Sequence, residues 1–265
     1  MALIGCSFAG ETSNYGIVKK EAFQLVSLAD RYYLEGDTES ALAVYKEAFN
    51  KFSMIDDLEG KVLSSLYISG TYNVMEQFDE ANEWFDKASN YSEGSYESIL
   101  TLTKCEQLYQ RKNYEEILNL ISSKTIESYQ NEIQLQLDSY ELLSAQALNK
   151  TIESLRDELI SNYNSNEINT VPEIKSFLGF SIGKSYFYSG EFSKANQYLS
   201  EALSIDKELA NTPAIAETLF MLGLNSEAMG DITEARTYFQ RSYESYSSIN
   251  SFRKMSEIEK KIDSL

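Results

Sequence analysis

A glycine–lysine–serine tripeptide is the part of this sequence whose residue types most resemble a chemical site. Residues 178–190 read LGFSIGKSYFYSG, in which Gly183, Lys184 and Ser185 follow Gly179. A phosphate-binding loop needs G-x4-G-K-[ST] after a buried strand, because its backbone N–H groups curl around the phosphates. Only three residues separate these two glycines, and no strand-like run precedes them. We therefore predict a helix here, and no nucleotide.

Other catalytic and metal-binding patterns are also missing. The 265 residues include no histidine, which excludes Ser-His-Asp and Cys-His catalysis and most zinc sites. Cys6 and Cys105 are too far apart to suggest a disulfide framework. No pair of carboxylates stands out, so a carboxylate-dependent hydrolase is a remote alternative that a pocket with perturbed acids would revive. We expect no catalytic residues, no metal and no cofactor.

The charge of the chain limits its partners. There are 23 basic and 41 acidic residues, a net charge of −18, which argues against nucleic acid as a partner. The acidic residues either cover solvated helix faces or line a groove that attracts a basic partner. No run of about 18 apolar residues could span a membrane in the chain as given. The chain contains only two prolines, which favours an all-helical fold.

Three segments of the chain share one pattern. They cover residues 28–48, 182–202 and 222–242. In each, a small residue is followed seven positions later by glycine and five positions after that by alanine. The small residues are Ala29, Gly183 and Gly223, the glycines are Gly36, Gly190 and Gly230, and the alanines are Ala41, Ala195 and Ala235.

The alanine position can be followed through the rest of the chain. Its equivalents are Ala41, Ala81, Ile117, Leu155, Ala195 and Ala235, at intervals of 40, 36, 38, 40 and 40 residues. The fourth copy, around Leu155, rests mainly on spacing. Cys105 occupies the small packing position of the third copy, where a buried cysteine acts as a small apolar residue.

This pattern resembles the tetratricopeptide repeat family, although the intervals exceed that family's period of about 34 residues. The resemblance implies an all-α, right-handed superhelical solenoid of about six helix–turn–helix repeats. Each glycine would end a first helix in a left-handed conformation, and stacked pairs would share a continuous core. We expect a repeat region at residues 17–249, with a degenerate fourth copy at 131–170. A capping helix would follow at residues 250–265.

In this family the first helices of the repeats line a concave surface that binds peptides. By position, the resemblance assigns that role to residues that follow the small packing residues or the tyrosines after them. Most are aromatic or acidic, which suits an apolar peptide with some positive charge better than a carboxylate clamp. The same face could instead be filled by the protein itself. The residues are Asp30, Tyr33, Asn73, Glu106, Tyr109, Phe180, Lys184, Phe187, Tyr188, Leu224 and Glu227.

The N-terminal residues suggest a lipid anchor. Leu3, Ile4, Gly5 and Cys6 resemble a bacterial lipobox, with a polar tether in the rest of residues 1–16. Lipidation of Cys6 would hold the chain on a membrane outside the cytoplasm. Against this, the basic region and apolar stretch of a signal peptide are missing, and Cys6 could be an incidental thiol.

We therefore expect a non-catalytic scaffold, a lipid-anchored repeat protein that holds a partner protein or peptide in its groove. The alternative is a cytoplasmic repeat protein that senses signalling peptides. Such regulators usually carry a DNA-binding or effector domain, for which the sequence has no room ahead of the repeats.

Overall fold

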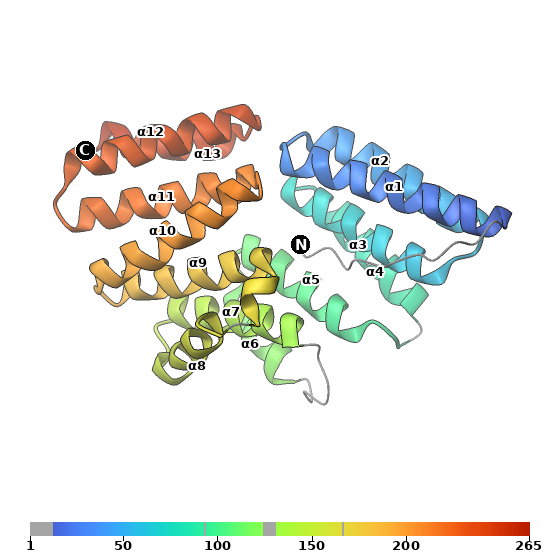
Figure 1. Cartoon of the computed structure of the whole chain (residues 1–265), viewed down its shortest axis with the longest axis horizontal. Helices are drawn as coiled ribbons and strands as arrows, with labels where there is room; N and C mark the ends of the chain where they lie inside the picture. The colour runs from blue at the N-terminus through green and yellow to red at the C-terminus, as the bar shows by residue number, and fades with distance from the viewer. Residues whose placement is uncertain (1–12, 93, 124–130, 166) are drawn as a thin grey trace. The chain divides into compact units, whose positions relative to one another are not determined.

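The computed structural model describes residues 13–92, 94–123, 131–165 and 167–265, and all regular elements in these ranges are helical (Figure 1). The predicted all-α class is confirmed. In chain order the elements are α1 (Asn14–Leu34), α2 (Thr38–Met54), α3 (Leu58–Val74), α4 (Phe78–Ser92), α5 (Glu97–Gln110), α6 (Tyr114–Ser122), α7 (Asn131–Ala147), α8 (Glu153–Tyr163), the 3-10 turn η1 (Ile168–Thr170), α9 (Pro172–Tyr188), α10 (Phe192–Glu208), α11 (Thr212–Ala228), α12 (Ile232–Ser248) and α13 (Phe252–Asp263).

Successive helices pack as pairs. Helix α1 packs on α2, α3 on α4, α9 on α10 and α11 on α12, while α7 packs mainly against α9. The chain divides into two compact units within the turn after α5, between Lys112 and Asn113. Helices α1 to α5 form the N-terminal unit, and α6 to α13 form the C-terminal unit. Each unit therefore has its own core and is considered by itself below.

The three predicted turn glycines end their first helices as expected. Gly36, Gly190 and Gly230 have φ angles of +79°, +77° and +85°, in the region that favours glycine. The N–H of the next residue donates back to a carbonyl of the helix's last turn, as in a Schellman motif; Asp37 N–H, for example, reaches the Tyr32 carbonyl at 2.9 Å. This turn sends the chain directly into the second helix.

Other pairs make the same turn without glycine. Glu76, Lys112 and Asn149 occupy the left-handed region, with φ angles of +59°, +59° and +54°. Only asparagine among these tolerates that conformation well. The turn geometry is therefore kept where the glycine signal is lost.

The fourth pair differs from the alignment predicted above. In the other pairs the left-handed residue is followed at once by the residue whose carbonyl accepts the first bond of the second helix, as with Gly36 and Asp37. In the fourth pair two extra residues separate Asn149 from that position, which is Ile152. The equivalent of Ala41 is therefore Arg156, whose N–H donates to the Ile152 carbonyl at 2.9 Å, and not Leu155.

Small residues on the first helices allow close packing of the second helices. A Cβ atom added at Gly183 would lie 2.8 Å from Leu199 Cγ, and one at Gly223 would lie 2.6 Å from the Phe239 ring. Cys105 is fully buried at the equivalent place in α5, and burial raises the pKa of its thiol to about 12. These positions have the packing role that the repeat pattern predicted.

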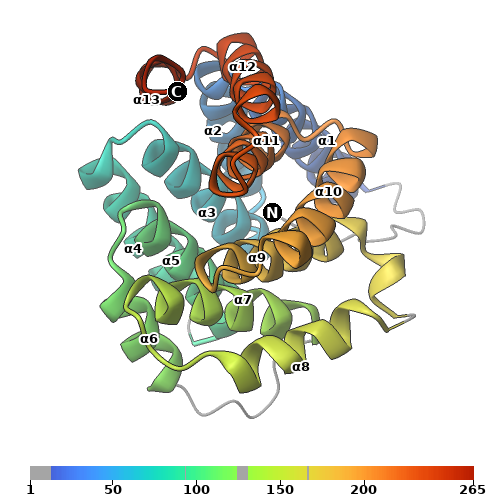
Figure 2. The same ribbon diagram turned by 90° about the vertical axis from the view of Figure 1, so that its left-hand side faces the viewer.

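Helix α13 covers the end of the C-terminal unit, where it packs beside α12 (Figure 2). Ile258 is 1% exposed and lies in a cluster with Phe239 and Tyr246 of α12, against which Met255 and Ile262 also pack. Near the start of the described residues, α1 begins at Asn14, with Ser13 as its N-cap. Cys6, the predicted lipidation site, lies outside the described residues.

Candidate partner-binding surfaces

In each unit the first helices of the pairs place their predicted binding residues on one side of the small packing position. Gly183 and Gly223 face the second helices, so Lys184 and Leu224, one residue on, point to the neighbouring side. We call the surface formed by these side chains the first-helix surface of a unit. Helices α1, α3 and α5 contribute to it in the N-terminal unit, and α9, α11 and α13 in the C-terminal unit.

The N-terminal first-helix surface contains tyrosines around a carboxylate. Tyr45 of α2 donates to Asp30 Oδ1 at 2.6 Å, and its ring stacks on Tyr67 of α3 with centroids 5.2 Å apart. The second carboxylate oxygen of Asp30 is buried and has no hydrogen-bond partner. Burial raises the pKa of Asp30 and outweighs the opposing effect of the Tyr45 hydroxyl. Burial and the nearby Glu106 raise the pKa of Tyr33. This surface is therefore aromatic and acidic.

Helix α5 adds Glu106 and Tyr109, which are half-buried, but it also covers Asn73. Asn73 is 2% exposed; its amide nitrogen donates to Gln110, and its amide oxygen accepts from Arg111 Nε at 2.7 Å. Both ends of this amide are thus used inside the unit, so Asn73 joins neighbouring repeats in the structure and has little surface to offer a partner.

The C-terminal first-helix surface is aromatic and carries a cation on α9. Lys184 Nζ lies 5.4 Å from the ring centroid of Phe180, within range of a cation–π interaction. Phe187 contacts Tyr188 edge-on, with centroids 5.2 Å apart. Tyr188 is 56% exposed, whereas Phe180 and Phe187 are half-buried. These four predicted residues therefore lie along α9, and Tyr188 is the most exposed of them.

On α11, Leu224 and Glu227 lie beside lysines of α13. Lys261 pairs with Glu227 at 2.7 Å, and Lys254 pairs with Glu217 at 3.0 Å. Tyr246 also donates to Glu217 at 2.7 Å. Burial pushes the pKa of Glu217 upward, but attraction to Lys254 and Lys184 and the hydrogen bonds from Tyr246 and Lys254 lower it overall. These contacts join α13 to the first-helix surface.

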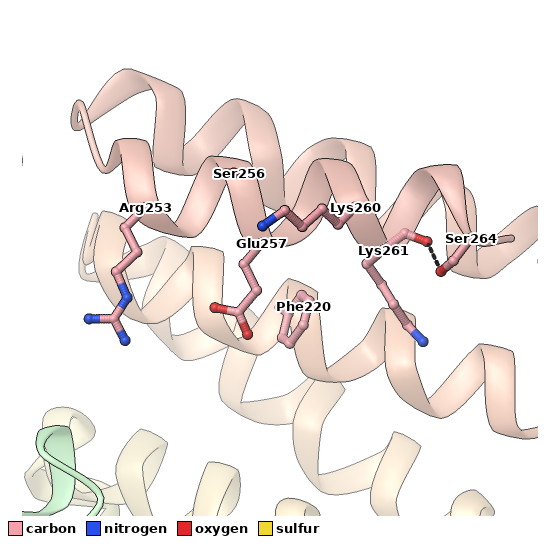
Figure 3. A pocket seen from close by; sticks show the side chains of 7 residues that line it. All are labelled: Phe220, Arg253, Ser256, Glu257, Lys260, Lys261 and Ser264. Carbon is pink, nitrogen blue, oxygen red and sulfur yellow. Dashed lines mark hydrogen bonds between the residues drawn. The ribbon is translucent and has the colours of Figure 1, made fainter.

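A cavity of about 590 Å³ opens between α11 and α13 (Figure 3). Phe220 is the contribution of α11, and the remaining lining comes from α13. In Figure 3, Arg253, Glu257 and Lys261 extend from α13 toward α11, with the Phe220 ring opposite them. The other residues that line it are Arg253, Ser256, Glu257, Lys260 and Lys261 of α13 and Ser264, the C-cap of α13.

Some residues of these surfaces were not predicted, although the sequence contains a signal for one of them. Phe220 lies three residues before Gly223, as Phe180 does before Gly183, so the repeat phase could have identified it. The side chains of α13 could not be found in this way, because α13 was predicted only as a cap. Tyr67 was also missed, since its place depends on stacking against Tyr45 of another helix.

Perturbed carboxylates also occur on α7. Burial raises the pKa of Asp138 to about 6, and burial together with Glu158 raises that of Glu141. Neither residue lines the cavity beside α13. Within the described ranges, no three Asp, Glu or Cys side chains are grouped as metal ligands would be. None of the described helices has both the length and the apolarity to cross a bilayer.

The glycine–lysine–serine tripeptide lies in the interior of α9. Gly183 packs against Leu199, Lys184 lies over Phe180, and the buried Ser185 bonds to the Gln146 side chain at 3.3 Å. Each of the three residues therefore has a role in helix packing or on the first-helix surface.

One family model and one solved structure agree with the helical repeat fold. Residues 178–248 match the family model for the tetratricopeptide repeat. The structure of aspartyl phosphate phosphatase F from Bacillus subtilis is similar, with a TM-score of 0.53 and 14% identity over 98% of this chain and 80% of that one. A structure of Pseudomonas aeruginosa pilF has a TM-score of 0.47 and 14% identity over 91% of this chain and 99% of that one. No curated protein matches the sequence.

Proposed function

We propose that this chain, in which residues 178–248 match the tetratricopeptide repeat model, is a non-catalytic scaffold that binds a protein or peptide on its first-helix surfaces. The proposal is supported most by the recurrence of large aromatic and charged side chains at equivalent places on successive first helices. In the C-terminal unit these include Phe180 and Phe187 on α9 and, 40 residues on, Phe220 and Glu227 on α11. Aromatic side chains of this kind are enriched at the centres of protein interfaces.

The proposal is tested by changing one residue on each first-helix surface. Phe187→Asp and Tyr33→Asp each place a charge on one of these surfaces, and Ile232→Asp places one on α12, where Ile232 is 41% exposed. We expect the first two variants to lose the partner captured by the wild-type chain from native cells, while Ile232→Asp retains it. Circular dichroism must show that all three are folded. Equal capture by all four proteins would contradict the proposal.

We also propose that Cys6 carries a lipid that holds this scaffold outside the cytoplasm. The support is the Leu3-Ile4-Gly5-Cys6 pattern. Labelled fatty acid should be incorporated in the native host by the wild type and by Cys105→Ser, but not by Cys6→Ser. If the wild type takes up no label, the alternative of a cytoplasmic peptide-sensing scaffold replaces this part of the proposal.

A further inference from the structure

A buried carboxylate connects three helices of the C-terminal unit. Asp206 lies in the last turn of α10, which packs on both α9 and α11, and is only 2% exposed. Ser176 of α9 donates to Asp206 Oδ1 at 2.5 Å, and the Thr218 hydroxyl of α11 also hydrogen-bonds to this carboxylate. Both hydroxyl residues are themselves buried. Asp206 therefore joins the two first helices that follow one another in this unit.

The repeat does not require a carboxylate at this place. Asp206 lies 11 residues after Ala195, and the positions 11 residues after the alanines of three other pairs carry no charge. These positions are Phe52, Ser92 and Tyr246, and all three are buried. An ionised carboxylate costs more to bury than any of these side chains. A titratable group that departs in this way from its equivalents is a candidate for a function of its own.

Burial controls the titration of Asp206. It raises the pKa of Asp206 to about 6, and the hydrogen bonds from Ser176 and Thr218 oppose this effect only in part. Charged residues flank the three partners on each helix, but none of them contributes to this pKa. They are Glu173 and Lys175 on α9, Glu201, Lys207 and Glu208 on α10, and Glu217 on α11.

The raised pKa makes the packing around Asp206 depend on pH. If the helices separate, the carboxyl group regains its ordinary pKa of about 4. The packed state therefore holds the proton more tightly than the open state. The resulting stabilisation is fully present below about pH 4 and is lost as the pH rises through about 6. Neutral solution thus weakens the packing that mildly acidic solution favours.

We propose that Asp206 is a pH-sensitive joint, which loosens α11 from α9 and α10 when its carboxyl group ionises. The first-helix surface of this unit has Phe180 and Phe187 on α9 and Phe220 and Glu227 on α11. Loosening changes how these two sets of side chains are held together. The consequence for binding rests on the proposed scaffold function: a partner that contacts both helices binds more tightly in mildly acidic solution.

The test measures hydrogen exchange of the full chain by mass spectrometry at pH 5 and pH 8, corrected for the intrinsic exchange rates. In the wild type, peptides from α10 and α11 should exchange about 10-fold faster at pH 8, because a pKa change of one corresponds to a tenfold change in an equilibrium constant. Asp206→Asn has a similar shape but does not ionise, so it should abolish this difference. Peptides from α1 and α2 should show no such difference in either protein.

Asp138→Asn is the matched control. Asp138 lies on α7, which packs on α9, and burial raises its pKa to about 6 as well. The pH effect on α10 and α11 should remain in this variant. The inference is overturned if the wild type shows no effect, if Asp206→Asn retains it, or if Asp138→Asn removes it to the same extent.

A direct titration keeps the inference testable if Asp206→Asn does not fold. Carbon-13 NMR of the wild type should show the Asp206 carboxyl group titrating with a midpoint near pH 6. A midpoint near pH 4 would overturn the inference, because the joint would then be ionised throughout the range tested.

Failure of this inference can be told apart from failure of the scaffold function. If exchange of α10 and α11 does not depend on pH while Phe187→Asp still abolishes partner capture, the scaffold function stands and the joint is wrong. If the pH effect is found but Phe187→Asp and Tyr33→Asp capture partners as the wild type does, the joint stands and its role in partner binding is wrong.

Discussion

At the scale of single residues, some turns between helices place a residue other than glycine in the left-handed conformation that favours glycine. Ala210 has a φ angle of +52° in the turn between α10 and α11, and its side chain is exposed. A side chain in this region of φ costs about 1–2 kcal/mol, and glycine avoids that cost. Glycine also loses more conformational entropy on folding than alanine, which offsets part of the gain. Ala210→Gly should therefore raise the free energy of unfolding in urea by about 0.5–1 kcal/mol.

Gly190→Ala is the matched control for this prediction. Gly190 has a φ angle of +77°, and an added Cβ would meet no atom within 4 Å, so only backbone strain would change. We expect this variant to lose about 1–2 kcal/mol. A loss of stability in Ala210→Gly would show that the turn does not hold Ala210 in the left-handed region.

A second prediction concerns the buried carboxylate on α7. Burial, with Glu141 and Glu158 nearby, raises the pKa of Asp138 to about 6, although Gln134 Nε2 donates to its carboxylate at 2.5 Å. The folded state therefore holds this proton more tightly than the unfolded state, so stability falls as the pH rises from about 4 through 6. Asp138→Asn should remove this loss.

The expected gain of Asp138→Asn over the wild type is near zero at about pH 3.5 and about 1 kcal/mol at pH 8, after allowance for solvent screening. Urea unfolding at both pH values measures it. Asp157→Asn, on an exposed position of α8, controls for the change in net charge. A gain in stability that is the same at both pH values would contradict the raised pKa of Asp138.

The residue scale also shows what the sequence could predict. Gly36, Gly190 and Gly230 were found because glycine is visible in the sequence and favours the left-handed conformation. Glu76 and Lys112 adopt the same conformation, but their residue types give no such signal. The burial of Asn73 was also hidden, because Gln110 and Arg111 reach it from the next repeat.

At the scale of elements, helix pairs follow from the spacing of small and large residues along the chain. In the fourth pair the spacing predicted Leu155 as the equivalent of Ala41, but the structure places Arg156 there. Two extra residues lie between Asn149 and Ile152 in the turn of this pair. Insertions in a turn leave no periodic signal, so the sequence alone could not place Arg156. In the structure Arg156 joins neighbouring pairs, since it lies 4.4 Å from the Tyr186 ring and donates to Ser189.

Helix α13 provides the prediction at this scale. Ile258 is 1% exposed and anchors α13 against the last pair. Ile258→Ala should lower the free energy of unfolding of the C-terminal unit by about 2 kcal/mol or more, because it leaves a cavity under the helix. Phe252, at the start of the same helix, is 72% exposed, and Phe252→Ala should change stability by less than about 0.5 kcal/mol. Equal effects of the two changes would mean that α13 does not cover the pair as described.

At the scale of the whole molecule, the same repeat phase predicted the fold and much of the candidate surface. Phe180, Lys184, Phe187 and Leu224 were named from their distance to the small packing residues, and they lie on first helices as that phase requires. The cations of α13 and the cavity beside Phe220 depend on how the last helix docks, which no repeat pattern describes. These features could therefore be found only in the structure.

The central claim is that partners bind on the first-helix surfaces, and photo-crosslinking in native cells tests it most directly. A benzoylphenylalanine is placed at Phe187 or Tyr33, and at Ile232 of α12 as the control. We predict that the first two positions form adducts with a second polypeptide and that Ile232 does not. Adducts from Ile232 alone, equal adducts from all three positions, or none from any of them would contradict the claim.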